Sequence, residues 1–143
     1  MPIRFFDEDI SSNIKHKNNH KLWLRSCIEK EGAEVGNINY IFCSDEFLYS
    51  MNKQYLNHST LTDIITFDLS EYENVLSADI FISIERVRDN ALKFEADFNE
   101  ELRRVLIHGA LHLLGYKDKT KADALIMREK ENTYIKKYKK HVK

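Results

Sequence analysis

The feature that most constrains this fold is an apolar segment over residues 102–113 that also contains two histidines. Its apolar side chains recur at helical spacing and cover much of the circumference, which is typical of a helix buried at the centre of a domain. His108 and His112 are four residues apart, so their rings project from the same face of that helix. The sequence therefore predicts a central helix that carries a pair of imidazoles and ends near Gly115, a residue suited to reversing the chain.

The chain reversal after Gly115 can bring Asp118 back toward the two imidazoles. Two nitrogens and one carboxylate oxygen suit zinc, and three protein ligands leave the fourth tetrahedral position for water, as in catalytic sites. The alternative is a pair of metal-free core histidines. The flanking glycines and the following carboxylate favour the metal site. We therefore predict one Zn²⁺ per chain, held by His108, His112 and Asp118, with both histidines in the catalytic centre.

Other hydrolytic motifs find little support in this sequence. In the peptidase motif HExxH the glutamate is the general base, and Gly109 occupies that position here. The sequence contains neither a GxSxG nucleophile turn nor a GxxxxGK[ST] phosphate loop. Bound zinc supports hydrolysis by polarising a water or a substrate oxygen, so we expect a metal-dependent hydrolase.

The composition is that of an ordinary globular protein. Hydrophobic residues make up 43% and charged residues 31% of 143 residues, with a formal net charge of −1, and we expect a single domain over residues 1–143. There is no run of about 18 apolar residues and the start lacks signal-peptide character, so we expect a cytoplasmic protein without a membrane partner. Cys27 and Cys43 form no CxxC pair and are expected to be buried apolar side chains.

The hydrophobic pattern predicts an α+β domain with a small mixed four-stranded sheet flanked by about five helices. Strands are expected near residues 3–6, 38–42, 64–67 and 78–82, with loops over 57–60 and 69–76. Helices are expected over 14–30 and after the capping residues Ser44, Ser83, Asp97 or Asn99, and Thr120. The strand order cannot be derived from this pattern.

The histidine segment HGALHLLGYKD resembles the signature HGxLHLxGYDH of the YbeY family of metal-dependent endoribonucleases. The resemblance extends upstream. NKQYLNHSTLTDIITF over residues 52–67 is similar to the family segment NxxYRxxDxPTDVLSF, and ADIFIS over residues 78–83 is similar to its GDIxI strand. Together these segments follow the family's order over most of the chain.

The resemblance implies a small α+β domain and a zinc-dependent endoribonuclease. Its expected action is maturation of ribosomal RNA, at the 3′ end of the small-subunit RNA, and ribosome quality control, with ribosomal RNA, the small subunit and its proteins as partners. His108 and His112 fall on the family's first two zinc-binding histidines. Thr62, Asp63 and Lys117 are the expected substrate-binding residues.

Two positions depart from the family pattern. Asp118 stands in place of the third zinc-binding histidine, and a carboxylate can replace an imidazole on zinc. Leu56 stands in place of an arginine, and leucine cannot form charge-assisted hydrogen bonds to a phosphate. Either another cation substitutes, the nearest in sequence being Lys53, His58, Lys117 and Lys119, or activity is reduced. A non-catalytic ribosome-assembly factor with a structural metal site, or a hydrolase of another substrate, is therefore the alternative function.

Overall fold

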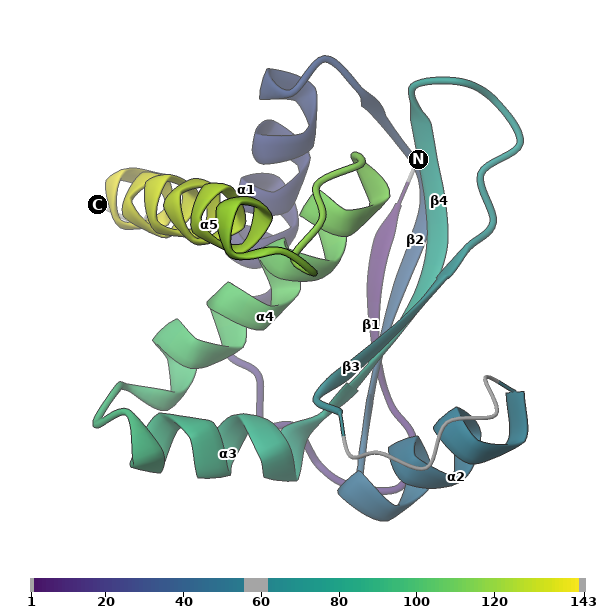
Figure 1. Cartoon of the computed structure of the whole chain (residues 1–143), viewed down its shortest axis with the longest axis vertical. Coiled ribbons are helices and arrows are strands. Elements are labelled where there is room, and N and C mark those ends of the chain that lie inside the picture. Colours follow the sequence, from purple (N-terminus) through teal and green to yellow (C-terminus); the bar gives the residue numbers. More distant parts are fainter. Residues whose placement is uncertain (1, 56–61, 142–143) are drawn as a thin grey trace.

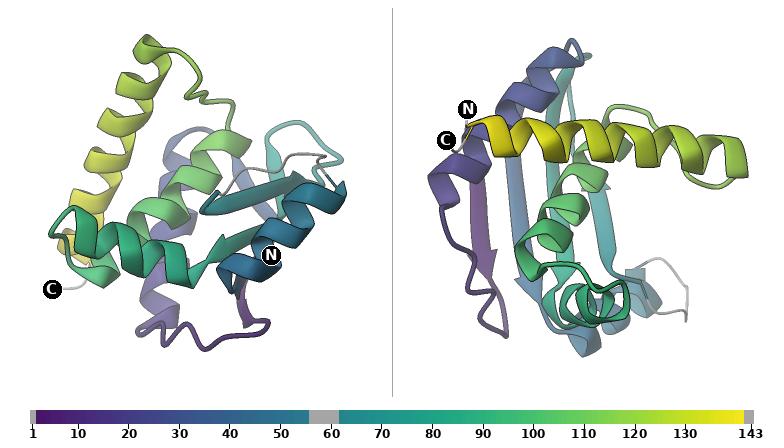
Figure 2. Two further views of the ribbon diagram at one scale, coloured as in Figure 1. Left: turned by 60° about the horizontal axis from the view of Figure 1, so that its bottom comes forward. Right: turned by 90° about the vertical axis from the view of Figure 1, so that its left-hand side faces the viewer.

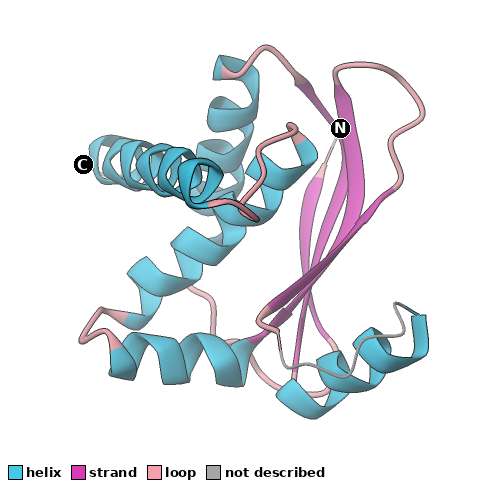
Figure 3. Ribbon diagram, in the orientation of Figure 1, coloured by secondary structure: helices cyan, strands magenta, loops and turns pink. Residues whose placement is uncertain are grey.

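The computed structural model describes residues 2–55 and 62–141. This part of the chain forms four strands and five helices in mixed order (Figure 3), as the sequence predicts. Their bounds are β1 Ile3–Asp7, α1 Lys17–Lys30, β2 Glu34–Cys43, α2 Asp45–Tyr55, β3 Ile64–Asp68, β4 Val75–Ser83, α3 Ile84–Lys93, α4 Phe98–Leu113 and α5 Lys121–His141.

The four strands form one mixed sheet in the order β1-β2-β4-β3. β1, β2 and β4 are parallel, whereas β3 runs antiparallel to β4, with Ile64 opposite Ile82 and Asp68 opposite Ala78. Because β3 pairs with β4 alone among the strands, it forms one edge of the sheet (Figure 1).

Helices cover both faces of the sheet unequally. α1, α3, α4 and α5 lie on one side, and α2 lies on the other (Figures 1 and 2). Alternation along the strands explains both contacts: Ile80 and Ile82 of β4 enter the main core, while Phe81 packs in a smaller cluster with Leu48 of α2 and Ile65 of β3. The mixed α+β architecture predicted from the sequence is confirmed.

α4 is the central helix, as its apolar circumference predicts. The Asp97 side chain accepts hydrogen bonds from the backbone N–H groups of Asn99 and Glu100, which begins the helix. The Tyr40 hydroxyl of β2 donates to the Leu106 carbonyl at 2.8 Å and ties α4 to the sheet. Gly109 faces the sheet so closely that a Cβ there would lie 3.0 Å from Ile64 Cδ1. This close approach places the histidine-bearing end of α4 beside β3.

Two predicted boundaries are wrong. The helix predicted over 14–30 begins at Lys17, because Asn13 and His16 adopt positive φ angles that are incompatible with a helix, although Ile14 is buried. The loop predicted over 69–76 is shorter, since β4 already begins at Val75, which pairs with Glu34 of β2.

The predicted helix N-caps at Ser83 and Thr120 are confirmed by the structure. Ser83 accepts a hydrogen bond from the Arg86 N–H, and Thr120 accepts one from the Asp123 N–H at 3.1 Å, so both side chains cap the helices that follow.

The side chains of Cys27 and Cys43 are buried, as the sequence predicts. Among the described helices, none has the length and apolar character needed to cross a membrane.

Candidate metal centre

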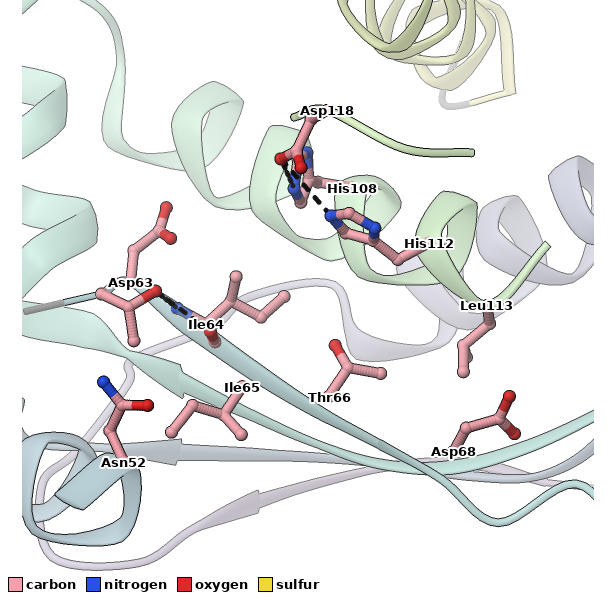
Figure 4. Close-up of a pocket in the computed structure, with 11 residues that line it drawn as sticks. Asn52, Asp63, Ile64, Ile65, Thr66, Asp68, His108, His112, Leu113 and Asp118 are labelled. Atoms are coloured by element: carbon pink, nitrogen blue, oxygen red, sulfur yellow. Dashed lines mark hydrogen bonds and ion pairs between the residues drawn. The ribbon is translucent and has the colours of Figure 1, made fainter. Parts of the chain in front are cut away.

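His108 and His112 lie one turn apart on α4 and direct their Nε2 atoms to the same point. The Asp118 Oδ2 atom is 3.4 Å from His108 Nε2 and 3.5 Å from His112 Nε2. Dashed lines mark these two contacts in Figure 4. The two rings meet edge to face with their centroids 4.5 Å apart. The structure therefore brings together the three side chains that the sequence predicts as metal ligands.

The turn after α4 carries Asp118 back over the helix. Gly115 has a φ of +105°, a conformation that favours glycine, and the Tyr116 N–H donates to the Leu111 carbonyl at 3.0 Å. The Tyr116 hydroxyl also donates to Glu31 Oε1 at the end of α1, at 2.6 Å. The predicted chain reversal at Gly115 is thus confirmed, and a hydrogen bond to a distant helix supports it.

The Glu31 carboxylate accepts hydrogen bonds from three side chains. Besides Tyr116, its carboxylate accepts from Lys130 Nζ at 3.1 Å and from the Tyr134 hydroxyl, both on α5. Burial alone would raise the pKa of Glu31, but these hydrogen bonds and the Lys130 charge outweigh it and lower that pKa below its usual value. The ionised Glu31 carboxylate therefore connects α1, α5 and the loop that carries Asp118.

The three ligand atoms fit a tetrahedral zinc ion. They all lie within 4.8 Å of one another. Two ligands bound at about 2.1 Å to a tetrahedral zinc are about 3.4 Å apart, close to both distances from the Asp118 oxygen. Two imidazole nitrogens and one carboxylate oxygen are also ordinary zinc donors. The residues present are thus compatible in type and spacing with a three-ligand zinc site.

A cavity of about 560 Å³ opens beside these ligands. Its walls come from α4, from β3 and the residues before it, and from α2 (Figure 4). The lining residues are Asn52, Thr62, Asp63, Ile64, Ile65, Thr66, Asp68, His108, His112, Leu113 and Asp118. A metal bound by the trio would consequently face a space large enough for part of a substrate.

The predicted substrate-binding residues divide into two groups. Thr62 and Asp63 line the cavity, whereas Lys117 is exposed on the loop and is not among the lining residues. The Thr62 hydroxyl also contacts the Ile64 carbonyl at 3.2 Å, so it has a local structural role at the start of β3. Burial raises the pKa of Asp63, and the His108 charge only partly offsets this.

Glu131 of α5 is a site residue that the sequence reasoning missed. Its Oε2 atom lies 2.7 Å from His108 Nδ1, and its Oε1 atom accepts from Arg104 Nη1 at 2.9 Å. Burial opposes ionisation of Glu131, but these two partners outweigh it and lower its pKa. For His108, burial favours the neutral ring, and the Glu131 hydrogen bond and charge reverse this and raise the pKa.

A second cavity, of about 300 Å³, is lined by two of the three candidate ligands, His108 and Asp118. It shares Asp63, His108 and Asp118 with the first cavity and extends to Arg128 and Glu131 of α5. The three shared residues therefore border both spaces. Neither cavity contains Lys53 or Lys119, which are exposed, while Leu56 and His58 lie outside the residues that the structure describes.

Comparison with known proteins gives a consistent result. The sequence model of one family, described as Endoribonuclease YbeY, matches residues 4–139. The Endoribonuclease YbeY of Flavobacterium psychrophilum is 50% identical over 138 residues, which cover 96% of each protein. That of Flavobacterium johnsoniae is 57% identical over 113 residues, which cover 79% of this chain and 81% of the relative.

A solved structure shares the fold. The solution structure of TM1509 from Thermotoga maritima superposes with a TM-score of 0.70 at 30% sequence identity, and the match covers 96% of this chain and 89% of the other. The match to the family over nearly the whole chain agrees with the segments HGALHLLGYKD, NKQYLNHSTLTDIITF and ADIFIS. The chain therefore belongs to the YbeY endoribonuclease family.

Proposed function

We propose that this protein is a zinc-dependent endoribonuclease that acts in ribosomal RNA maturation through a single domain over residues 1–143. The observation that carries the proposal is the convergence of His108 Nε2, His112 Nε2 and Asp118 Oδ2 at the wall of the 560 Å³ cavity. These three residues would hold one Zn²⁺, with both histidines in the catalytic centre. Membership of the YbeY endoribonuclease family supports RNA as the substrate class.

When bound, zinc supplies a Lewis acid that polarises a phosphoryl oxygen or lowers the pKa of a bound water. The residues of this chain would position the RNA around that point. Asp63 borders both cavities and can accept a hydrogen bond from a ribose hydroxyl, which distinguishes RNA from DNA. Thr62 can donate to a phosphate oxygen, and the exposed Lys117 ammonium can neutralise a neighbouring phosphate.

The cellular role proposed here is processing of the small-subunit RNA at its 3′ end, together with ribosome quality control. The partners would be ribosomal RNA and the small ribosomal subunit with its proteins, in the cytoplasm. This part of the proposal rests on the family alone. Binding of the purified protein to isolated small subunits, measured by co-sedimentation, tests it directly.

A peptidase function is disfavoured by the position of Gly109. A glutamate there would supply the general base of an HExxH peptidase, but this position faces the sheet rather than the cavity. A Cβ at Gly109 would already lie 3.0 Å from Ile64 Cδ1 and 3.4 Å from Ile80. The backbone at this position is therefore committed to packing α4 against β3 and β4.

The decisive experiment is cleavage of purified ribosomal RNA by the zinc-loaded protein, beside a chelator-treated sample and the His112→Ala variant. We expect cleavage by the loaded protein and its loss in both controls. Cleavage that persists in both controls would contradict the metal-dependent mechanism. A folded, zinc-replete protein that binds small subunits but cuts no RNA would instead favour a ribosome-assembly factor with a structural metal.

A further inference from the structure

The buried carboxylate of Glu131 links α5 to two residues on one stripe of α4. Arg104 and His108 lie one turn apart on α4, and both contact Glu131. Glu131 is only 4% exposed. A carboxylate removed from water in this way is stable only when its oxygens are paired. Here Arg104 Nη1 pairs with Oε1 at 2.9 Å and His108 Nδ1 pairs with Oε2 at 2.7 Å.

This pairing fixes which nitrogen of His108 carries a proton. An ionised carboxylate can only accept hydrogen bonds, so the 2.7 Å contact requires the proton on Nδ1. In the neutral ring, the lone pair then lies on Nε2. Nε2 is the nitrogen that lies 3.4 Å from Asp118 Oδ2, at the proposed metal position. Glu131 therefore selects the tautomer, and the ring orientation, that zinc binding needs.

Arg104 holds Glu131 in place. Its Nη1 atom bonds to Glu131, and its Nη2 atom donates to the Asn132 side chain at 2.9 Å. The Arg104 guanidinium on α4 thus donates hydrogen bonds to two consecutive residues of α5, Glu131 and Asn132. Because a guanidinium presents its donors in a rigid planar fork, this arrangement restricts where the Glu131 carboxylate can lie. The orientation of His108 consequently depends on the packing of α5 against α4.

We propose that Glu131 is a positioning residue for the metal centre, acting through His108 and held by Arg104. The inference rests on the zinc site proposed above and concerns the affinity and geometry of that site. Partners that accept the free N–H of a ligating histidine commonly change metal affinity by about 10- to 100-fold. His112 provides the internal contrast, since within the described residues no hydrogen bond to its Nδ1 atom is found.

The test is a zinc competition titration of the full-length protein against a chromophoric chelator. Glu131→Gln keeps the side-chain volume but removes the charge, and we expect it to weaken zinc binding by about 10- to 100-fold. Glu129→Gln is the matched control, because it removes the same charge from an exposed position on α5 and should leave the affinity unchanged. Equal zinc affinity of Glu131→Gln and wild type would overturn the inference while leaving the metal site intact.

Two further measurements separate the possible failures. Wild-type protein that binds no zinc would overturn the metal centre itself, and this inference with it. If Glu131→Gln does not fold, nitrogen NMR of the zinc-loaded wild type decides instead. We expect a protonated His108 Nδ1 and zinc on Nε2, whereas zinc on Nδ1 would refute the role of Glu131. A cobalt absorption spectrum altered by Glu131→Gln but not by Glu129→Gln would confirm an effect on geometry.

Discussion

His108 and His112 are the same residue type on the same face of one helix, yet the protein holds them differently. The His108 side chain is 21% exposed and its Nδ1 atom contacts the buried Glu131. The His112 side chain is 33% exposed, and its only ion pair within the described residues is to Asp118. Helical spacing makes both Nε2 atoms available to one metal, but in the part of the chain that the structure describes a hydrogen bond to the Nδ1 atom is found for His108 alone. The two proposed ligands therefore have the same helical spacing pattern in sequence but different surroundings in the structure.

The largest effects are expected when each histidine is replaced. His108→Ala and His112→Ala should both weaken zinc binding by more than about 100-fold, since losing a ligand costs more than losing an outer partner. The two variants should differ once zinc is removed. His108→Ala should lower the free energy of unfolding by about 1–3 kcal/mol, because Glu131 stays buried with a hydrogen bond missing. His112→Ala should change it by less than about 0.5 kcal/mol.

Urea denaturation in the presence of a chelator measures this difference, and circular dichroism checks that both variants fold. Equal losses of stability in the metal-free proteins would break the comparison between the two histidines. A zinc affinity close to wild type in either variant would remove that histidine from the ligand set.

A smaller loss of zinc affinity is expected when Asp118, the proposed ligand on the loop after α4, is replaced. Asp118→Asn should weaken zinc binding by at least about 10-fold, because a neutral amide oxygen is a poorer zinc ligand than a carboxylate. Asp118→His restores the residue of the family signature and should retain binding. The side chain is 41% exposed, so neither variant should alter the stability of the metal-free protein much. Isothermal titration with zinc tests both, and unchanged affinity of Asp118→Asn would exclude the carboxylate as a ligand.

The smallest effect on zinc affinity is expected when Glu31, which holds the loop containing Asp118 through Tyr116, is replaced. Glu31→Gln weakens the anchor for Tyr116 and should reduce zinc affinity by less than about 10-fold, or about 1.4 kcal/mol. The exposed Glu29, near the same end of α1, offers the control Glu29→Gln, which should bind zinc like the wild type. A loss as large as that of Asp118→Asn would show that the loop, rather than α4, dominates the site.

The parts of the site that could be predicted from sequence are those encoded locally. The i, i+4 spacing of His108 and His112 and the glycine at position 115 each determine a geometry within a few residues, and the structure has both. Glu131 was not predictable in this way. It meets His108 only because α5 packs across α4, and its own neighbours in sequence carry no metal-site pattern.

In the fold, too, locally encoded features could be predicted from sequence, whereas features that depend on long-range pairing could not. Capping by Ser83 and Thr120 follows from side chains beside the helix ends and was predicted. The true start of β4 depends on pairing with β2, where the Glu34 N–H donates to the Asn74 carbonyl at 2.8 Å. The antiparallel placement of β3 at the sheet edge likewise depends on long-range pairing. That placement decides that β3 forms a wall of the larger cavity.

The three proposed ligands all lie within residues 108–118, whereas the β3 wall of the cavity begins at Ile64. Closing so short a loop costs little entropy, so the unfolded chain should keep some zinc affinity of its own. Zinc that binds both states raises the melting temperature less than its affinity for the folded protein suggests. During synthesis, residues 108–118 could therefore bind zinc before the sheet has folded. Zinc binding would then be a separate step from formation of the cavity wall that would contact RNA.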